Sequence, residues 1–170
     1  MSNVPTLELD MCGKMLREKY LGEIMAIIKA VCISEKKGTA KINVGQAEII
    51  EDFGLKDDAH AGNWHRQVSL LSYEKIEEFK ALGVEVKDGD FGENLIVEGI
   101  DLRTLPIGTK LKIKDILLEV TQIGKECHTG CAIAQAVGKC IMPTEGIFAK
   151  VLKGGTVKIG DEVILDPLCS

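Results

Sequence analysis

One stretch decides the fold: Pro106-Ile107-Gly108-Thr109-Lys110-Leu111-Lys112-Ile113, continued after Lys114-Asp115 by Ile116-Leu117-Leu118-Glu119-Val120-Thr121. Lysine alternates with leucine or isoleucine over residues 110–113, which predicts a strand with one buried face, and residues 116–121 predict a second strand. A similar stretch, Gly154-Gly155-Thr156-Val157-Lys158-Ile159-Gly160-Asp161, continues as Glu162-Val163-Ile164-Leu165. Both stretches are therefore expected to form tight turns that join amphipathic strands.

Other segments extend this β pattern along the chain. Apolar or β-branched runs bounded by turn residues predict strands within residues 22–34, 47–51, 67–71 and 94–97. One helix is expected to begin after Ser72 and to stop at Gly83, and a short helix is expected over residues 132–137. Repeated hairpins with few helices predict a mainly β fold, a β-barrel-like closed sheet with a few short helices, because closure removes exposed strand edges.

Length and composition indicate one folded domain. The chain has 170 residues, of which 45% are hydrophobic and 28% are charged, so we expect a single domain over residues 22–168 preceded by an N-terminal extension over residues 1–21. A net charge of -5 argues against a nucleic-acid binder. No apolar run reaches the roughly twenty residues that cross a membrane, and the N-terminus resembles no signal peptide, so a cytoplasmic location is expected. The oligomeric state stays open.

Three of the six cysteines, Cys127, Cys131 and Cys140, lie close together in the sequence. In the cytoplasm they are expected to be reduced. Cys131 falls in the first turn of the predicted helix, whose dipole stabilises a thiolate, and Cys127 has Lys125 and His128 nearby as sources of positive charge. The thiols could attack an electrophile, carry persulfide sulfur, bind a soft metal or form a redox pair, and burial as small apolar groups is the structural alternative. A zinc site has weak support because a second closely spaced ligand pair is lacking.

Ordered motifs resemble the MOSC domain, the C-terminal region of molybdenum cofactor sulfurases. They are Asp58-Ala59-His60-Ala61-Gly62 with Arg66-Gln67-Val68-Ser69-Leu70-Leu71, then Phe91-Gly92-Glu93-Asn94-Leu95, Pro106-Ile107-Gly108 and Cys127. Residues 140–155 resemble the ending of compact, stand-alone bacterial members. The resemblance implies a barrel of the MOSC or pyruvate kinase β-barrel type, with a reactive cysteine in a cleft. The chain departs from many members in having Gly124-Lys125-Glu126 before that cysteine, and in having Cys131 after it.

The resemblance implies a role with the molybdenum cofactor, molybdopterin. Cys127 is then the principal thiol, as a persulfide carrier or molybdenum ligand, and Cys131 assists it. Five residues are predicted to bind the cofactor, with loop anchoring as their structural alternative: His60, Arg66, Lys125, His128 and Asn94. Asp58 is expected to shape its loop, and Glu93 to bind nearby backbone donors.

The expected partners are the molybdenum cofactor itself, or the enzymes that make it or supply its sulfur. Neither a membrane nor a nucleic acid is expected as a partner. A chain of 170 residues has no room for a pyridoxal phosphate domain beside this one, so pyridoxal phosphate is not expected. Two alternatives remain: a non-catalytic metal- or ligand-binding module with structural cysteines, and a molybdenum-dependent reductase of N-oxygenated compounds. Whether the protein is an enzyme stays open.

Overall fold

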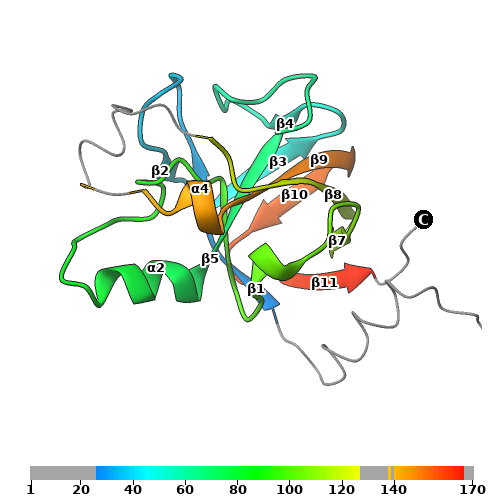
Figure 1. Ribbon diagram of the computed structural model, residues 1–170. Coiled ribbons are helices and arrows are strands. Elements are labelled where there is room, and N and C mark those ends of the chain that lie inside the picture. Colours follow the sequence, from blue (N-terminus) through cyan, green and yellow to red (C-terminus); the bar gives the residue numbers. More distant parts are fainter. Residues whose placement is uncertain (1–25, 127–137, 139, 167–170) are drawn as a thin grey trace, which may run out of the picture.

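The computed structural model describes residues 26–126, 138 and 140–166 (Figure 1). The predicted N-terminal extension over residues 1–21 and the predicted helix over residues 132–137 lie outside these residues. The described elements, in chain order, are β1 (Ala26–Ile33), β2 (Ile42–Asn43), β3 (Gln46–Ile50), β4 (Gly54–Leu55), β5 (Val68–Ser72), α2 (Tyr73–Lys80), β6 (Leu95–Glu98), the 3-10 helix η1 (Leu102–Thr104), β7 (Lys110–Ile113), β8 (Ile116–Ile123), α4 (Met142–Glu145), β9 (Ile147–Lys153), β10 (Gly155–Lys158) and β11 (Glu162–Asp166). Within this part of the chain, no helix is long and apolar enough to cross a membrane.

Seven strands close into a barrel, which confirms the predicted mainly β class. Their order is β11-β7-β8-β9-β5-β6-β1, and Ala26 of β1 pairs with Val163 of β11 to complete the ring. All of these pairings are antiparallel except that of β5 with β6. Helix α2 follows β5 directly and carries the chain away from the sheet before it returns as a parallel neighbour (Figure 1), since parallel strands need such a crossover.

Residues 110–123 form the predicted hairpin. Strands β7 and β8 pair from Ile113 with Ile116 outward, around a turn in which Lys114 has a positive φ of 53°. The similar stretch at residues 154–165 forms the predicted tight turn between two strands, closed by the N–H of Asp161 on the carbonyl of Lys158, but these strands do not pair with each other, so a hairpin here is wrong. Strand β10 pairs with β3 in a separate three-stranded sheet, whereas β11 joins the barrel. The turn at Gly160 therefore moves the chain from one sheet to the other.

Two apolar clusters hold the fold together. The first fills the barrel and includes Leu70, Leu95 and Leu118, all fully buried. The second lies outside the barrel wall, where Ile76 and Phe79 of α2 pack against it, and the ring of Phe79 meets that of Phe91 edge to face at 5.2 Å. Burial of this face stabilises a helix that is too short to be stable alone.

The helix after Ser72 is confirmed, with two corrections at its ends. Its last residue is Lys80, and Leu82 is 74% exposed, so Leu82 does not continue the apolar face. Ser72 occupies the N-cap position without a side-chain capping bond. Its hydroxyl instead donates to the carbonyl of Ile100 at 2.9 Å and accepts the N–H of Leu102 at 3.1 Å, which ties β5 to the 3-10 helix.

One end of the barrel gathers most of the residues that the sequence singled out. Strand β1 ends there, and β5 and β6 begin there, as the antiparallel pairing of β1 with β6 and the parallel pairing of β5 with β6 require. The loops over residues 34–41, 56–67 and 88–94 consequently leave or enter the barrel at this end, and Gln122 of β8 contacts the second of them through His65. We call this end, with these three loops, the rim.

Candidate functional site

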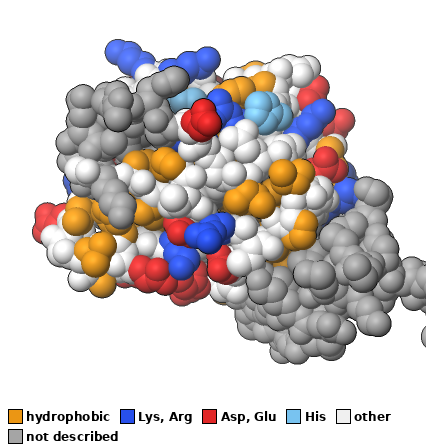
Figure 2. Space-filling model, in the orientation of Figure 1, with side chains coloured by type: hydrophobic (Ala, Val, Ile, Leu, Met, Phe, Trp, Pro, Cys, Tyr) orange, Lys and Arg blue, Asp and Glu red, His pale blue; other side chains and the backbone are white. Residues whose placement is uncertain are grey.

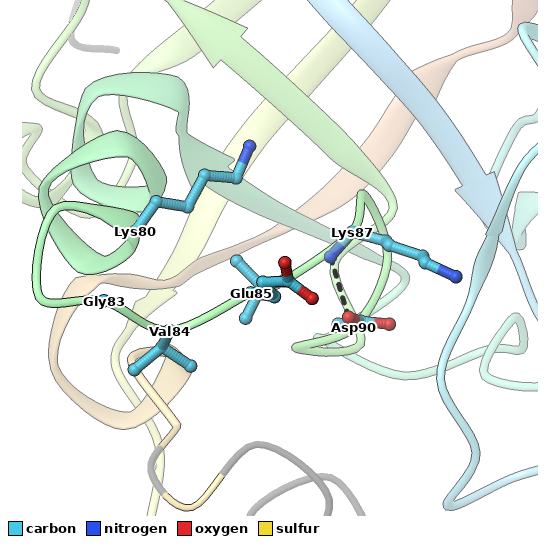
Figure 3. A pocket seen from close by; sticks show the side chains of 7 residues that line it. Lys80, Gly83, Val84, Glu85, Lys87 and Asp90 are labelled. Carbon is cyan, nitrogen blue, oxygen red and sulfur yellow. Dashed lines mark hydrogen bonds between the residues drawn. The ribbon is translucent and has the colours of Figure 1, made fainter.

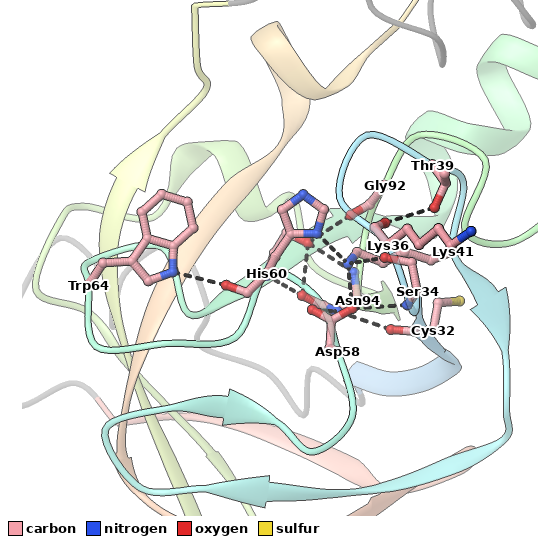
Figure 4. A network of polar contacts seen from close by, with 11 residues as sticks. Cys32, Ser34, Lys36, Thr39, Lys41, Asp58, His60, Trp64, Gly92 and Asn94 are labelled. Carbon is pink, nitrogen blue, oxygen red and sulfur yellow. Dashed lines mark hydrogen bonds and ion pairs between the residues drawn. The ribbon is translucent and has the colours of Figure 1, made fainter.

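A buried ion pair lies at the centre of the rim. The Nζ atom of Lys41 is 2.6 Å from Oδ1 of Asp58, and the two side chains are 1% and 0% exposed. Asp58 also accepts the backbone N–H of Ser34 at 3.0 Å and an amide hydrogen of Asn94 at 3.2 Å. The expectation that Asp58 shapes its loop is confirmed, because its carboxylate holds two other segments, the loop over residues 34–41 and the start of β6 at Asn94, around it (Figure 4).

Lys41 joins His60 to this pair. Its Nζ lies 3.1 Å from Nδ1 of His60 and 3.4 Å from the hydroxyl of Ser34, so the ammonium faces one acceptor for each of its three hydrogens. Burial lowers the pKa of Lys41, and the hydrogen bond and charge of Asp58 oppose that shift. Burial, followed by the charge of Lys41, lowers the pKa of His60. Both effects favour the neutral form of the His60 ring.

Asn94 connects the strands below this pair. Its amide nitrogen donates to the carbonyl of Cys32 at 3.0 Å as well as to Asp58. Its oxygen accepts the backbone N–H of Ser69 at 3.0 Å and the hydroxyl of the same residue at 3.1 Å. Every hydrogen-bonding position of this amide is used within the protein. The structure thus gives Asn94 a scaffolding role, and its direct contact with a cofactor stays a prediction.

Arg66 lies between two aromatic rings at the start of β5. Its guanidinium carbon is 4.6 Å from the centre of the Trp64 ring and 5.4 Å from that of Phe148. The Nε atom of Arg66 is buried and has no hydrogen-bond partner. Trp64 is itself fixed by a 3.0 Å bond from its indole N–H to the carbonyl of His60. Because a buried donor without a partner is costly, Arg66 is suited to receive an acceptor from outside the chain.

Further polar groups lie at the end of β8. The Nε2 atom of His65 is 2.9 Å from the amide oxygen of Gln122, so Nε2 is the donor. Gln122 in turn donates to the carbonyl of Gly124 at 2.8 Å. The charge of Lys125 contributes to the low pKa of His60, which places Lys125 on the same side of the barrel. Figure 2 shows histidine, basic and acidic side chains side by side on the upper part of the molecule.

Of the three predicted thiols, the structure describes only that of Cys140. Cys127, His128 and Cys131 lie outside the described residues. Cys140 is half-buried and packs against the second apolar cluster, which also contains Cys32. Burial raises the pKa of the Cys32 thiol, so Cys32 is an inert core residue. The described residues contain no group of three or more His, Cys, Asp or Glu side chains that could hold a metal ion.

Glu93 stabilises the rim loop over residues 88–94 from inside the protein. Its carboxylate is fully buried and accepts the backbone N–H groups of Gly89 at 2.8 Å and Phe91 at 3.0 Å, which confirms its expected backbone role. Burial raises the pKa of Glu93 to about 7, against these hydrogen bonds. The carboxyl group therefore changes charge inside the folded protein close to neutral pH.

This shift predicts a pH-dependent stability. The folded state holds the proton of Glu93 up to about pH 7, whereas the unfolded chain releases it near 4.5. The contribution of Glu93 is therefore fully present below pH 4.5 and is lost as the pH rises through 7, by about 3 kcal/mol. Urea unfolding from pH 4.5 to 8 should show Glu93→Gln gaining stability relative to the native protein by about that amount. A difference in stability between the two proteins that does not change with pH contradicts it.

Sequence reasoning missed Lys41 and Ser34. Lys41 stands in the run Thr39-Ala40-Lys41-Ile42, where a lysine ordinarily predicts a solvated surface residue. Its burial depends on Asp58, seventeen positions later, and nothing in the local sequence signals this partner.

A separate pocket lies at the C-terminal end of α2, between Lys80 and the segment that follows it. It has a volume of about 600 Å³ and is lined by Lys80, Gly83, Val84, Glu85, Val86, Lys87 and Asp90. The backbone N–H of Lys87 donates to the carboxylate of Asp90 at 2.7 Å (Figure 3). None of the predicted site residues lines this pocket, so the rim is the stronger candidate.

Comparison with known proteins agrees with this fold and these motifs. The family model described as MOSC domain matches residues 57–164, more than half of the chain. The crystal structure of the YuaD protein from Bacillus subtilis is 20% identical, with a TM-score of 0.68, over 83% of this chain and 96% of that one. YiiM from Escherichia coli is 19% identical, with a TM-score of 0.59, over 84% of this chain and 69% of its own.

YiiM from Geobacillus stearothermophilus gives similar values: 18% identity and a TM-score of 0.58, over 84% of this chain and 74% of that one. No curated protein sequence matches the chain. The structural likenesses support the fold, and the family model covers the loop of Asp58, His60 and Arg66, strands β5 to β10 and most of β11. The chain therefore belongs to the MOSC domain family.

Proposed function

We propose that this protein binds the molybdenum cofactor at the rim and uses the thiol of Cys127 either to carry sulfur to it or to ligate its molybdenum. The MOSC family is associated with molybdenum-cofactor-related proteins. The observation that carries the proposal beyond the family is the buried, unpartnered Nε of Arg66 at this end of the barrel.

The donors on the rim fit the anionic part of such a cofactor. Molybdopterin carries a phosphate, and an arginine guanidinium offers a forked set of donors that matches phosphate oxygens. Contacts with the rings of Trp64 and Phe148 restrict the movement of that guanidinium. Lys125 supplies a second positive charge, while His60 supplies a neutral hydrogen-bond donor. His128 belongs to the same proposal on its sequence position alone.

The thiols supply the sulfur chemistry in this proposal. When bound, the cofactor supplies a molybdenum centre that accepts sulfur or a thiolate. Cys127 is the principal thiol, and Lys125, two residues earlier, stabilises its thiolate form by charge. Cys131 assists as the neighbouring thiol. A soft sulfur ligand suits both sulfur transfer and metal ligation.

The proposal is tested by cofactor loading under anaerobic conditions. Protein is purified from cells that make molybdopterin, and bound molybdenum, pterin and sulfane sulfur are measured per chain. Arg66→Gln should retain the cofactor about tenfold less tightly, since a hydrogen bond to a charged group contributes about 1.5 to 3 kcal/mol. Arg103→Gln is the matched control, because Arg103 is exposed and pairs with Glu145, and it should load normally.

The same experiment distinguishes the role of the Cys127 thiol from that of the Cys140 thiol. Cys127→Ser should lose the sulfane sulfur or the molybdenum, whereas Cys140→Ser should keep both. Equal loading of Arg66→Gln and Arg103→Gln contradicts the assignment of the anion site. Stoichiometric zinc in place of molybdenum, lost together with folding on chelation, supports the alternative of a metal-binding module with structural cysteines.

A further inference from the structure

The side chain of His60 is held by a contact that selects one of its two neutral forms. The three hydrogens of the Lys41 ammonium face Asp58 at 2.6 Å, His60 Nδ1 at 3.1 Å and Ser34 at 3.4 Å. An ammonium has no lone pair and cannot accept a hydrogen bond. Nδ1 of His60 must therefore be the acceptor, and the proton of the neutral ring lies on Nε2.

The ion pair makes this arrangement rigid. The side chains of Lys41 and Asp58 are 1% and 0% exposed. Asp58 is also held by Ser34 and Asn94, which belong to two other segments. Lys41 is also fixed through its backbone, whose N–H donates to the carbonyl of Gly89 at 2.8 Å. The ammonium therefore cannot leave Nδ1 without breaking contacts to several loops.

The second ring nitrogen of His60, Nε2, is available to a ligand. His60 is only half-buried, and its second nitrogen points away from the network (Figure 4). The carbonyl of the same residue accepts the indole N–H of Trp64, and the ring of Trp64 covers Arg66. The backbone of His60 is thus fixed beside Trp64, the aromatic residue that contacts the guanidinium of Arg66.

From these contacts we infer that Lys41 is a positioning residue, which holds His60 as a neutral ring that donates a hydrogen bond from Nε2 to an oxyanion bound at the rim. The role of His60 is then that of a fixed donor and neither that of a cation nor that of a metal ligand through Nδ1. The ligand part of this inference rests on the proposed function, whereas the state of the ring does not.

The charges around His60 support the same state. Lys41, Lys125 and Lys37 lower the pKa of the ring and Asp58 raises it, while burial is the largest cause and lowers it. Three cations against one carboxylate favour the uncharged ring. Protonation of His60 would place a positive charge beside the Lys41 ammonium, and it would remove the acceptor that Lys41 uses.

The test is nitrogen NMR of the imidazole rings in cofactor-free protein labelled at histidine. The chain has three histidines, and His60→Gln assigns the signals. At pH 7 the expected pattern for His60 is a bare Nδ1 and a protonated Nε2. A proton on Nδ1, or a charged ring at this pH, overturns the inference. Because the native protein itself gives this result, the test does not depend on any variant folding.

Lys41→Met tests the cause. With the cation removed and Asp58 retained, the pKa of His60 should rise and the bare Nδ1 pattern should be lost. Lys56→Met is the matched control, since Lys56 is 57% exposed and pairs with Glu48 at the surface. An unchanged His60 pattern in folded Lys41→Met overturns the role of Lys41. Failure of cofactor loading leaves these spectra unaffected, so the two hypotheses fail separately.

Inorganic phosphate tests the ligand step. Added to labelled cofactor-free protein, it should shift the Nε2–H signal of His60 in the native protein and cause a smaller shift in Arg66→Gln. A signal that does not respond to phosphate in either protein contradicts the donor role.

Discussion

Asp58→Ala is expected to lower the free energy of unfolding by about 3 to 5 kcal/mol, the usual cost of removing one partner from a buried ion pair. The substitution leaves the ammonium of Lys41 fully buried without its carboxylate at 2.6 Å. It also leaves the N–H of Ser34 and one amide hydrogen of Asn94 without an acceptor. Urea unfolding at constant pH measures the loss, with the denaturant slope as a check on two-state behaviour.

The surface pair of Glu48 and Lys56 supplies the control. Their charged atoms are 3.4 Å apart, but the side chains are 56% and 57% exposed. Solvent screening reduces the value of such a pair, so Glu48→Ala should change the free energy of unfolding by less than about 1 kcal/mol. Similar losses in the two variants would mean that the Lys41 and Asp58 pair does not hold the rim together.

Gly89→Ala is expected to cost about 2 to 4 kcal/mol in the free energy of unfolding. Gly89 has a φ of 93°, where a residue with a Cβ atom is strained. A Cβ atom added there would also overlap the backbone carbonyl of Lys41, the residue whose N–H donates to Gly89. The substitution therefore pushes apart the two loops that position the ion pair.

Gly83→Ala separates the strain from the overlap. Gly83 has a similar φ of 89°, and a Cβ atom added there meets nothing within 4 Å. Its cost should be about 1 kcal/mol, from the backbone conformation alone. If both glycine variants lose the same amount, close approach to Lys41 is not what requires glycine at position 89.

The barrel could be predicted from the sequence because its strands carry local signals. Alternation over residues 110–113 and the turn at Lys114 are sufficient for one hairpin. The pairing of Ala26 with Val163, which closes the ring, joins distant parts of the chain, so no local sequence pattern predicts it. The similar stretches that begin at residues 106 and 154 differ in how their strands pair: the first forms a hairpin, and the strands of the second enter two different sheets. The strands available as neighbours, and not the turn, decide which sheet a strand enters.

The site was predictable only where polar residues share a loop. His60 and Arg66 stand out in one polar segment, and the structure places both at the rim. Lys41 could not be found in this way, since it belongs to an ordinary surface pattern and becomes buried only when Asp58 folds against it. Asn94 was selected as a cofactor contact, yet all of its hydrogen bonds are used inside the protein.

These findings give the rim two parts with separate tasks. The buried part, made of Lys41, Asp58 and Asn94, fixes the loops. The outer part, made of Arg66 in its aromatic clamp and the outward nitrogen of His60, presents donors to a ligand. Stability measurements report on the first part, and loading and NMR measurements report on the second.

Native mass spectrometry of freshly purified protein, under anaerobic conditions and from cells that make molybdopterin, tests the central claim most directly. The account predicts a noncovalent complex with the mass of the pterin cofactor, together with either molybdenum in that complex or one additional sulfur atom on the peptide that contains Cys127. Protein that carries neither cofactor nor added sulfur, after both have been supplied, contradicts the account.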